Sequence, residues 1–301
     1  MKQRFVYCVL LGCLCLAMLT PPASQAGQVL NDALTSRPFR HHVWQDILTH
    51  WVSSGGEVDF ARIRAFPRRL NEYLDQLASV SPDSDASYFP TREDQAAYWI
   101  NAHNAIALRI ILDHYPVTSL SQVSDFETNR RYKLGGKPYT LRQIRARALS
   151  YQKYPQILFG LTDYTLDAPP LQPQAYEGKN LKTLTHQALQ TTLHNKQLVS
   201  FERTGSSCVY LSLSPYFQEY EDALFSPPSY REEDRDTIAA VDRHIKPVSY
   251  GNWTDTFRNY APPSLYSDLG HTCSQRVRFR GANRTLRQAP YQTATSRRIQ
   301  Q

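Results

Sequence analysis

The sequence predicts an α+β fold. We expect a single domain with a helical N-terminal half around a central buried helix, a small antiparallel sheet and a disordered tail. A mostly apolar segment of about six helical turns lies between Pro90 and Pro116. Short strand-like runs separated by glycine turns appear only after this segment. From about residue 267 the chain is rich in Arg, Gln, Thr and Ser and shows no periodicity, which is typical of disorder.

The first 26 residues have the pattern of a secretory signal. Lys2 and Arg4 precede an apolar run, and the small-residue pattern Ser24-Gln25-Ala26 follows it. We therefore expect cleavage after Ala26 and export to the periplasm or the extracellular space. A retained anchor and a lipoprotein cleavage at Cys13 are alternatives, although the apolar run is short for a membrane span.

Two amphipathic helices are predicted before the central one. Residues 27–39 form an expected leader, and the domain is predicted to span residues 40–266. Apolar residues recur at helical spacing up to Trp51, and the breaker Ser53-Ser54-Gly55-Gly56 follows. A second apolar stripe consists of Leu70, Tyr73, Leu74 and Leu77.

The central helix is predicted to begin at Thr91, which is a good N-cap residue, with Asp94 completing a pattern close to a capping box. Pro116 ends it. His103 and Asn104 fall inside its apolar arc, and Asn101 lies on the flank. Buried polar groups need hydrogen-bond partners. These side chains therefore either fix neighbouring backbone or line a site, and the pattern alone does not decide between the two.

The remaining chain is predicted to alternate short strands and helices. Gly135-Gly136 marks the turn of a hairpin. Further expected elements are a helix at 141–149, a buried strand at 157–162, an irregular segment at 163–173, a helix at 181–193, paired strands at 199–203 and 208–213, helices at 216–225 and 237–244, and an aromatic closing segment at 250–260.

Charge and cysteine content change after export. Cleavage leaves two of the five cysteines, Cys208 and Cys273, which form either one disulfide or two free thiols. Loss of Lys2 and Arg4 lowers the formal net charge from +7 to +5, and residues 269–301 contain seven Arg and no acidic residue. The basic character therefore belongs to the tail of residues 267–301. This tail is a candidate for binding anionic surfaces, and we predict no specific binding of nucleic acid.

Few motifs indicate chemistry. The sequence has no Gly-rich phosphate loop, no His-Glu-x-x-His and no Gly-x-Ser-x-Gly, so we predict no cofactor and no metal site. His41 and His42 are adjacent but lack a third ligand. Asp163 and Asp167 share a loop, where they either act as paired carboxylates or cap turns. Cys208 is interpreted as a core thiol or a disulfide half rather than a nucleophile.

Several motifs resemble the domain-of-unknown-function 547 family. The segment Tyr98–Ala105 is similar to the family's central motif, Phe-Trp-Ile-Asn-x-Tyr-Asn-Ala, and His114-Tyr115-Pro116 and Val58-Asp59-Phe60 also fit. The resemblance covers roughly residues 40–260 and implies an α+β fold, without a settled activity. The residues that carry the family motif are Trp99, Asn101, Asn104, Tyr115 and Pro116.

The departures from the family pattern bear on function. The resemblance implies a His before Phe159 and a Cys within Ser-Cys-Pro-Pro-Leu, but Leu158 and Ala168 stand at these positions. A thiolate nucleophile requires a sulfur and a partner that activates it. Any Cys/His chemistry of the usual members would therefore be lost. His103 replaces the commoner Tyr of the motif, either as a tolerated change or as new chemistry.

Three functions follow from this reading. The first is an exported, non-catalytic binding or scaffold protein of the cell envelope, with an unknown protein or envelope component as its partner and no transmembrane span in the mature chain. The second is a residual or re-tooled hydrolase or transferase that uses His103, Asn104, Asp163 and Asp167. The third is a binder of anionic surfaces through the Arg-rich tail.

Overall fold

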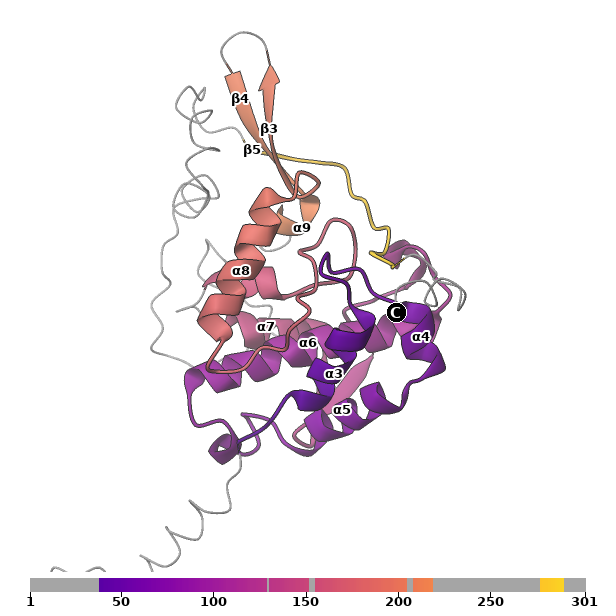
Figure 1. Cartoon of the computed structure of the whole chain (residues 1–301), viewed down its shortest axis with the longest axis vertical. Helices are drawn as coiled ribbons and strands as arrows, with labels where there is room; N and C mark the ends of the chain where they lie inside the picture. The colour runs from indigo at the N-terminus through magenta and orange to yellow at the C-terminus, as the bar shows by residue number, and fades with distance from the viewer. Residues whose placement is uncertain (1–37, 129, 152–154, 205–207, 219–276, 290–301) are drawn as a thin grey trace, which may run out of the picture. The chain divides into compact units, whose positions relative to one another are not determined.

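A computed structural model describes residues 38–128, 130–151, 155–204, 208–218 and 277–289. The chain divides into two compact units, Met1–Phe39 and Arg40–Gln301. All helices and strands described below belong to the second unit, which has the predicted α+β fold (Figure 1). The predicted signal sequence lies outside the described residues.

The unit begins with three helices, α3 (His42–Trp51), α4 (Phe60–Ala65) and α5 (Arg68–Ser79). The apolar face of α3 is buried, and Trp44 stacks on Tyr73 of α5 with ring centres 5.6 Å apart. The N-terminus of α4 is capped by Asp59, whose carboxylate accepts a hydrogen bond from the backbone of Arg62 at 3.0 Å. The predicted helices at 43–51 and 70–77 are therefore confirmed.

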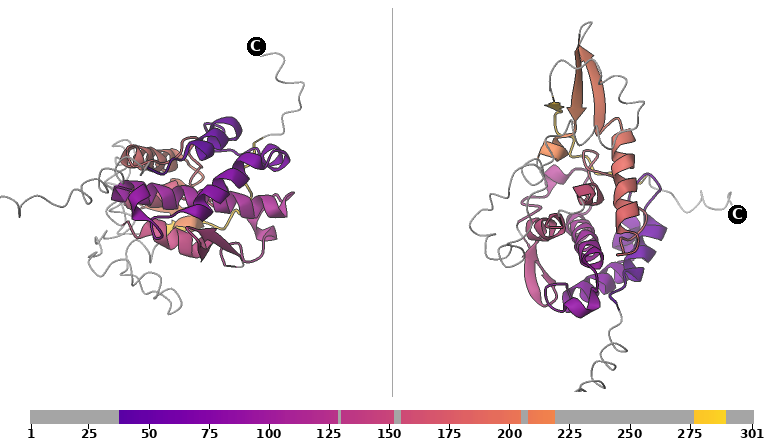
Figure 2. Two further views of the ribbon diagram at one scale, coloured as in Figure 1. Left: turned by 90° about the horizontal axis from the view of Figure 1, so that it is seen from below. Right: turned by 90° about the vertical axis from the view of Figure 1, so that its left-hand side faces the viewer.

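The central helix α6 (Arg92–His114) is also confirmed. Thr91 and Asp94 form a complete capping box at its start. Every residue from 96 to 108 is buried, because α5, α7 and α8 all pack against this helix (Figures 1 and 2). At its other end, the Arg64 guanidinium donates to the carbonyl oxygens of Leu112 and Tyr115 at 2.8 and 2.7 Å.

A short 3₁₀ turn, η1 (Ala86–Tyr88), precedes α6, and another, η2 (Leu120–Gln122), follows it. The predicted hairpin consists of β1 (Arg131–Leu134) and β2 (Lys137–Thr140), which pair antiparallel. Gly135 and Gly136 form its turn with φ of +52° and +82°, which side chains rarely tolerate. Thr140 then caps α7 (Leu141–Leu149).

The predicted strand at 157–162 is wrong. Residues Pro155–Gly160 form a 3₁₀ helix, η3, which packs against α8 (Leu181–His194). Residues 157 to 161 are all buried, and such a short apolar run does not distinguish a buried strand from a buried helical turn. The irregular segment that follows and the helix at 181–193 are as predicted.

The second sheet contains β3 (Val199–Thr204), β4 (Cys208–Leu213) and β5 (Val277–Phe279). β3 and β4 pair antiparallel as predicted, while β5 adds to β4 in the parallel direction. Helix α9 (Pro215–Gln218) begins the predicted helix at 216–225. The rest of that helix, the helix at 237–244 and the closing segment at 250–260 lie outside the described residues.

Part of the predicted tail belongs to the folded domain. The predicted boundary fell at residue 267, but residues 277–289 form β5 and isolated β-bridges to Val58, Ser119 and Thr165. The composition of this segment is polar and basic, but backbone hydrogen bonds hold it regardless of side-chain type. Residues 267–276 and 290–301 lie outside the described residues.

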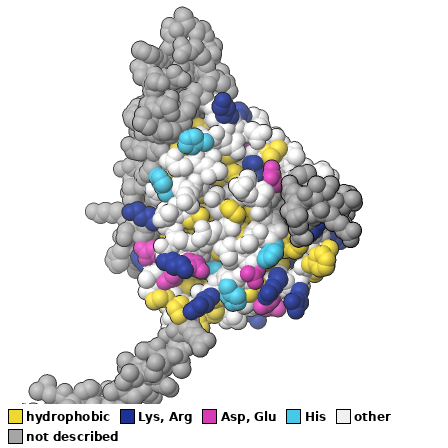
Figure 3. Space-filling view, viewed as in Figure 1, with side chains coloured by type: hydrophobic (Ala, Val, Ile, Leu, Met, Phe, Trp, Pro, Cys, Tyr) yellow, Lys and Arg dark blue, Asp and Glu magenta, His cyan; other side chains and the backbone are white. Residues whose placement is uncertain are grey.

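Several charges of the described residues pair, and Arg69, for example, lies 3.5 Å from Asp46 and 3.2 Å from Glu72. Charges of both signs are interspersed on the face shown in Figure 3. This face is therefore not a basic surface. Among the described residues, no helix is both long and apolar enough to cross a membrane.

Candidate functional site

The motif residue Asn101 clamps a distant piece of backbone. Its side-chain amide donates to the carbonyl oxygen of Tyr176 at 2.7 Å and accepts from the amide of the same residue at 3.1 Å. Asn101 is completely buried in α6. One side chain therefore satisfies both backbone polar groups of Tyr176, which would otherwise need partners inside the protein.

Asn104 acts in the same way on η3 and the turn after it. Its amide donates to the carbonyl oxygen of Gly160 at 2.9 Å and accepts from the amide of Thr162 at 3.2 Å. The Tyr164 hydroxyl donates back to the Asn104 carbonyl oxygen at 2.7 Å.

A third amide, from α3, completes this arrangement. Gln45 donates to the Pro173 carbonyl oxygen at 3.3 Å and accepts from the amide of Ala175 at 2.8 Å. We call Gln45, Asn101 and Asn104 the amide seam. Together they fix segment 160–176, which forms no named strand or helix after Gly160, against α3 and α6.

His103 lies beside this seam. Its Nδ1 is 3.2 Å from Oδ1 of Asn104. Burial lowers the pKa of the imidazole to about 4, the contact with Asn104 opposes this shift, and the nearby Arg145 lowers the pKa further. The ring is therefore neutral at pH values near 7, as suits a side chain that is 2% exposed.

The two loop aspartates cap local backbone. Asp163 accepts from the amide and the hydroxyl of Thr165 at 2.9 and 2.6 Å, and Asp167 accepts from the amide of Asn283. Burial raises the pKa of both carboxyl groups, and these hydrogen bonds partly offset the shift. Within the described part of the chain, no hydrogen bond connects either aspartate to His103.

Glu127 is a charged neighbour that the sequence reasoning missed. Its carboxylate forms a two-pronged ion pair with Arg145. Burial raises the pKa of Glu127, but Arg145, His103 and Arg142 together lower it by more, and the net shift is downward. Glu127 also lies within electrostatic reach of His103 and of Asp163. It stands in a loop without a recognisable motif, so no sequence signal pointed to it.

Leu158 and Ala168, at the positions where the resemblance implies a His and a Cys, are both 0% exposed. Both belong to one group of buried side chains in mutual contact, which we call the apolar cluster. The other members of this cluster are Phe159, Ala188, Leu189, Leu193, Leu198, Val199, Leu213, Tyr216 and Phe217.

Two other motif residues, Trp99 and Tyr115, form packing contacts with neighbouring side chains. Trp99 packs edge-to-face on Tyr98 and Tyr139, and the Tyr115 ring lies 5.9 Å from the Arg64 guanidinium. The peptide bond between Tyr115 and Pro116 is cis. For the predicted cysteine pair, Cys208 begins β4 but Cys273 lies outside the described residues.

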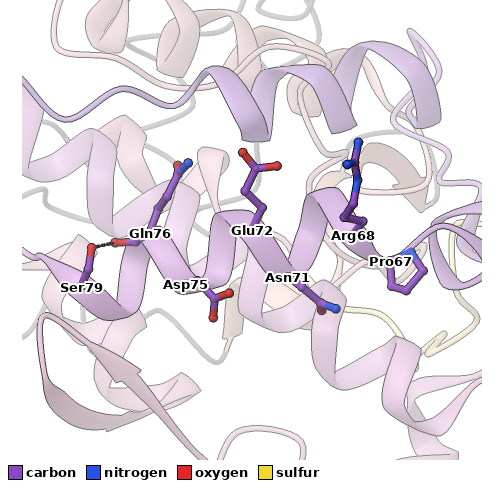
Figure 4. Close-up of a pocket in the computed structure, with 7 residues that line it drawn as sticks. All are labelled: Pro67, Arg68, Asn71, Glu72, Asp75, Gln76 and Ser79. Atoms are coloured by element: carbon purple, nitrogen blue, oxygen red, sulfur yellow. Dashed lines mark hydrogen bonds between the residues drawn. The ribbon is translucent and has the colours of Figure 1, made fainter.

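A shallow groove lies along α5 (Figure 4). Its lining residues all come from this helix and the proline before it. In Figure 4, Arg68, Glu72 and Gln76 point to one side of the helix, and Asn71 and Asp75 point to the other. None of the candidate site residues contributes to it. His41 is buried with Nδ1 2.7 Å from the Tyr73 hydroxyl. Among the described residues no group of three or more His, Cys, Asp or Glu is placed to hold a metal ion.

These features define an α+β protein in which motif amides position an irregular segment against a central helix. The family described as "Protein of unknown function, DUF547" matches residues 89–191. This range includes α6, the asparagines of the amide seam, Leu158 and Ala168. The resemblance drawn from the motifs is therefore confirmed over residues 89–191, which match this family. No curated protein and no solved structure matches the chain.

Proposed function

We propose that this protein is an exported, non-catalytic binding or scaffold protein of the cell envelope. The observation that carries the proposal is the burial of Leu158 and Ala168 in the apolar cluster. An aliphatic side chain and a methyl group offer neither a nucleophile nor a base. Both positions are filled in a way that stabilises the fold.

The polar residues near these positions support the same conclusion. The side-chain amides of Asn101 and Asn104 form hydrogen bonds with backbone groups. His103 contacts Asn104, and its lowered pKa removes it as a proton donor near neutral pH. The proposed location in the envelope rests on the signal-like pattern of the first 26 residues.

Site-resolved thiol labelling of the purified mature protein tests the non-catalytic reading. An alkylating probe would be applied between about pH 5 and pH 9, with and without reductant, because a free thiol has a pKa of about 8.5. We expect Cys208 to label either only at high pH, as an ordinary thiol, or only after reduction, as half of a disulfide.

Fast labelling of Cys208 near pH 6 would contradict the proposal, because it would reveal an activated thiolate elsewhere in the fold. A peptide of the same local sequence is the matched control, since it reports the reactivity of this thiol without the folded environment.

A further inference from the structure

Residues 283–289, which we call the C-terminal strap, run in an extended path between three separate parts of the domain (Figure 1, yellow). On one side, the Leu286 amide donates to the Thr118 carbonyl oxygen, and the Leu120 amide donates to the Arg284 carbonyl oxygen, both at 2.9 Å. The strap therefore pairs with the segment just after α6.

The other side of the strap pairs with the loop that leads to Ala168. The Arg287 amide donates to the Tyr164 carbonyl oxygen at 2.7 Å, and the Leu166 amide donates to the Thr285 carbonyl oxygen at 2.8 Å. At the end of the strap, Val58 exchanges two hydrogen bonds with Arg287 and Ala289, at 3.1 and 3.0 Å.

The backbone of residues 118–120, 164–166 and Val58 thus pairs with an extended chain. We call the site formed by these residues the strap groove. Backbone hydrogen bonds of this kind are available to any peptide, whereas the side chains determine which peptide fits. Leu286 is buried at 5% exposure, while residues 283–285 and 288 are exposed. The Arg287 guanidinium lies 3.3 and 3.4 Å from the carbonyl oxygens of Leu166 and Ala168.

The groove also complements a basic peptide electrostatically. Glu57 and Asp163 both attract Arg287. Asp167 accepts from the backbone of Asn283 and attracts Arg284. In the strap, Leu286 occupies a buried position, and the next residue, Arg287, faces carbonyl and carboxylate oxygens. A peptide with an apolar residue followed by a cation therefore fits the same two positions.

We propose that this groove binds extended basic peptides containing a Leu-Arg pair, and that the strap is its built-in occupant. Such a peptide from another protein takes the place of the strap. This inference rests on the proposed role as a binding module and names its partner class. Exchange is favoured because few side chains of the strap are buried.

Exchange can be tested in the full chain with a protease recognition sequence inserted after Gly281. This residue is exposed, and apart from its two chain neighbours no atom of the described residues lies within 4 Å of a side-chain carbon added there. Cleavage after folding leaves the strap attached only by non-covalent contacts. A fluorescent peptide of residues 281–291 is then added to cleaved and uncleaved protein, and binding is followed by anisotropy.

We expect the cleaved protein to bind the peptide at least tenfold more tightly than the uncleaved protein, and increasing salt to weaken this binding. A peptide with Leu286→Ser should lose at least tenfold in affinity. A peptide with Gln288→Ala is the matched control and should bind within threefold of the parent, because Gln288 is exposed.

Three results would overturn the proposal: a folded cleaved protein that binds no peptide, equal binding before and after cleavage, or unfolding on cleavage, which would make the strap a fixed part of the core. Circular dichroism distinguishes the last result from the first. Thiol labelling at Cys208 does not depend on strap exchange, so the failure of this inference and the failure of the proposed function give different readouts.

Discussion

The amide seam and the apolar cluster hold the same stretch of chain, residues 155–176, by opposite means. The seam uses three amide side chains to satisfy backbone groups that have no strand partner. The cluster buries Leu158 and Ala168 among aliphatic and aromatic side chains, without a polar group from either. The polar motif residues thus maintain the backbone path, while Leu158 and Ala168, where the resemblance implies a His and a Cys, lie in the core. The side-chain amides of this region bond to backbone groups of the protein itself.

The largest effect is expected from Leu158→His, which places an imidazole in the apolar cluster. The variant loses the leucine contacts and buries an unpartnered polar group, which together should cost at least about 4 kcal/mol of unfolding free energy. Urea denaturation checks this value, with Leu158→Met as the volume-conserving control. A variant as stable as the parent would show that position 158 lies in a polar, open site.

Asn104→Ala removes one clamp of the amide seam. The Gly160 carbonyl oxygen and the Thr162 amide lose their partner, and orphaned buried groups of this kind should together cost about 3 kcal/mol. Denaturant unfolding measures the loss, and Asn71→Ala, at an exposed position of α5, is the control. A loss below about 0.5 kcal/mol would mean that the seam contributes little to stability.

Acid should destabilise the protein through its buried imidazoles. An unfolded His gains a proton near pH 6.5, but folded His103 does so only near pH 4 and folded His41 near pH 3. The unfolded state therefore binds more protons as the pH falls from about 6.5, and the free energy of unfolding decreases by roughly 2 kcal/mol per imidazole between about pH 7 and pH 5.

His103→Tyr, which introduces the usual residue of the family motif, should remove one of these two contributions. Denaturation at the two pH values gives the difference, and His186→Tyr is the control because His186 is exposed. An unchanged pH dependence in the His103 variant would mean that the pKa of this ring is not lowered in the folded protein.

A smaller effect is expected where the seam meets η3. A side-chain carbon at Gly160 would lie 2.8 Å from the Tyr176 hydroxyl oxygen, a group without a hydrogen-bond partner in the described part of the chain. Gly160→Ala should therefore cost about 1–3 kcal/mol, and Tyr176→Phe, nearly neutral alone, should recover part of this loss. A double-mutant cycle measures the coupling between the two substitutions. Strictly additive effects would show that a side chain at position 160 does not contact the Tyr176 hydroxyl.

The sequence predicts the frame of the fold well. Thr91 and Pro116 mark the ends of α6, and Gly135-Gly136 marks the hairpin, because caps and turns depend on neighbouring residues. The roles of Asn101 and Asn104 could not be chosen from sequence, because their backbone partners are 75 and 56 residues away. The sequence therefore identifies Asn101 and Asn104 as candidate site residues, but it does not predict which groups they bind.

The strap was missed for a different reason. Its side chains are mostly exposed and polar, so its composition resembles that of a disordered tail, while its backbone makes the contacts. The strand expected at 157–162 failed because continuous burial has no period. Tertiary contacts decided both cases.

The most direct test of the closed site is an Ala168→Cys variant, labelled in the native state with an alkylating probe. The thiol should be protected by the apolar cluster and should react only as the protein unfolds, so its labelling rate should rise steeply with urea. Rapid labelling of this cysteine without denaturant, with the fold retained, would contradict the account, because the position would then be open to solvent and ready for chemistry.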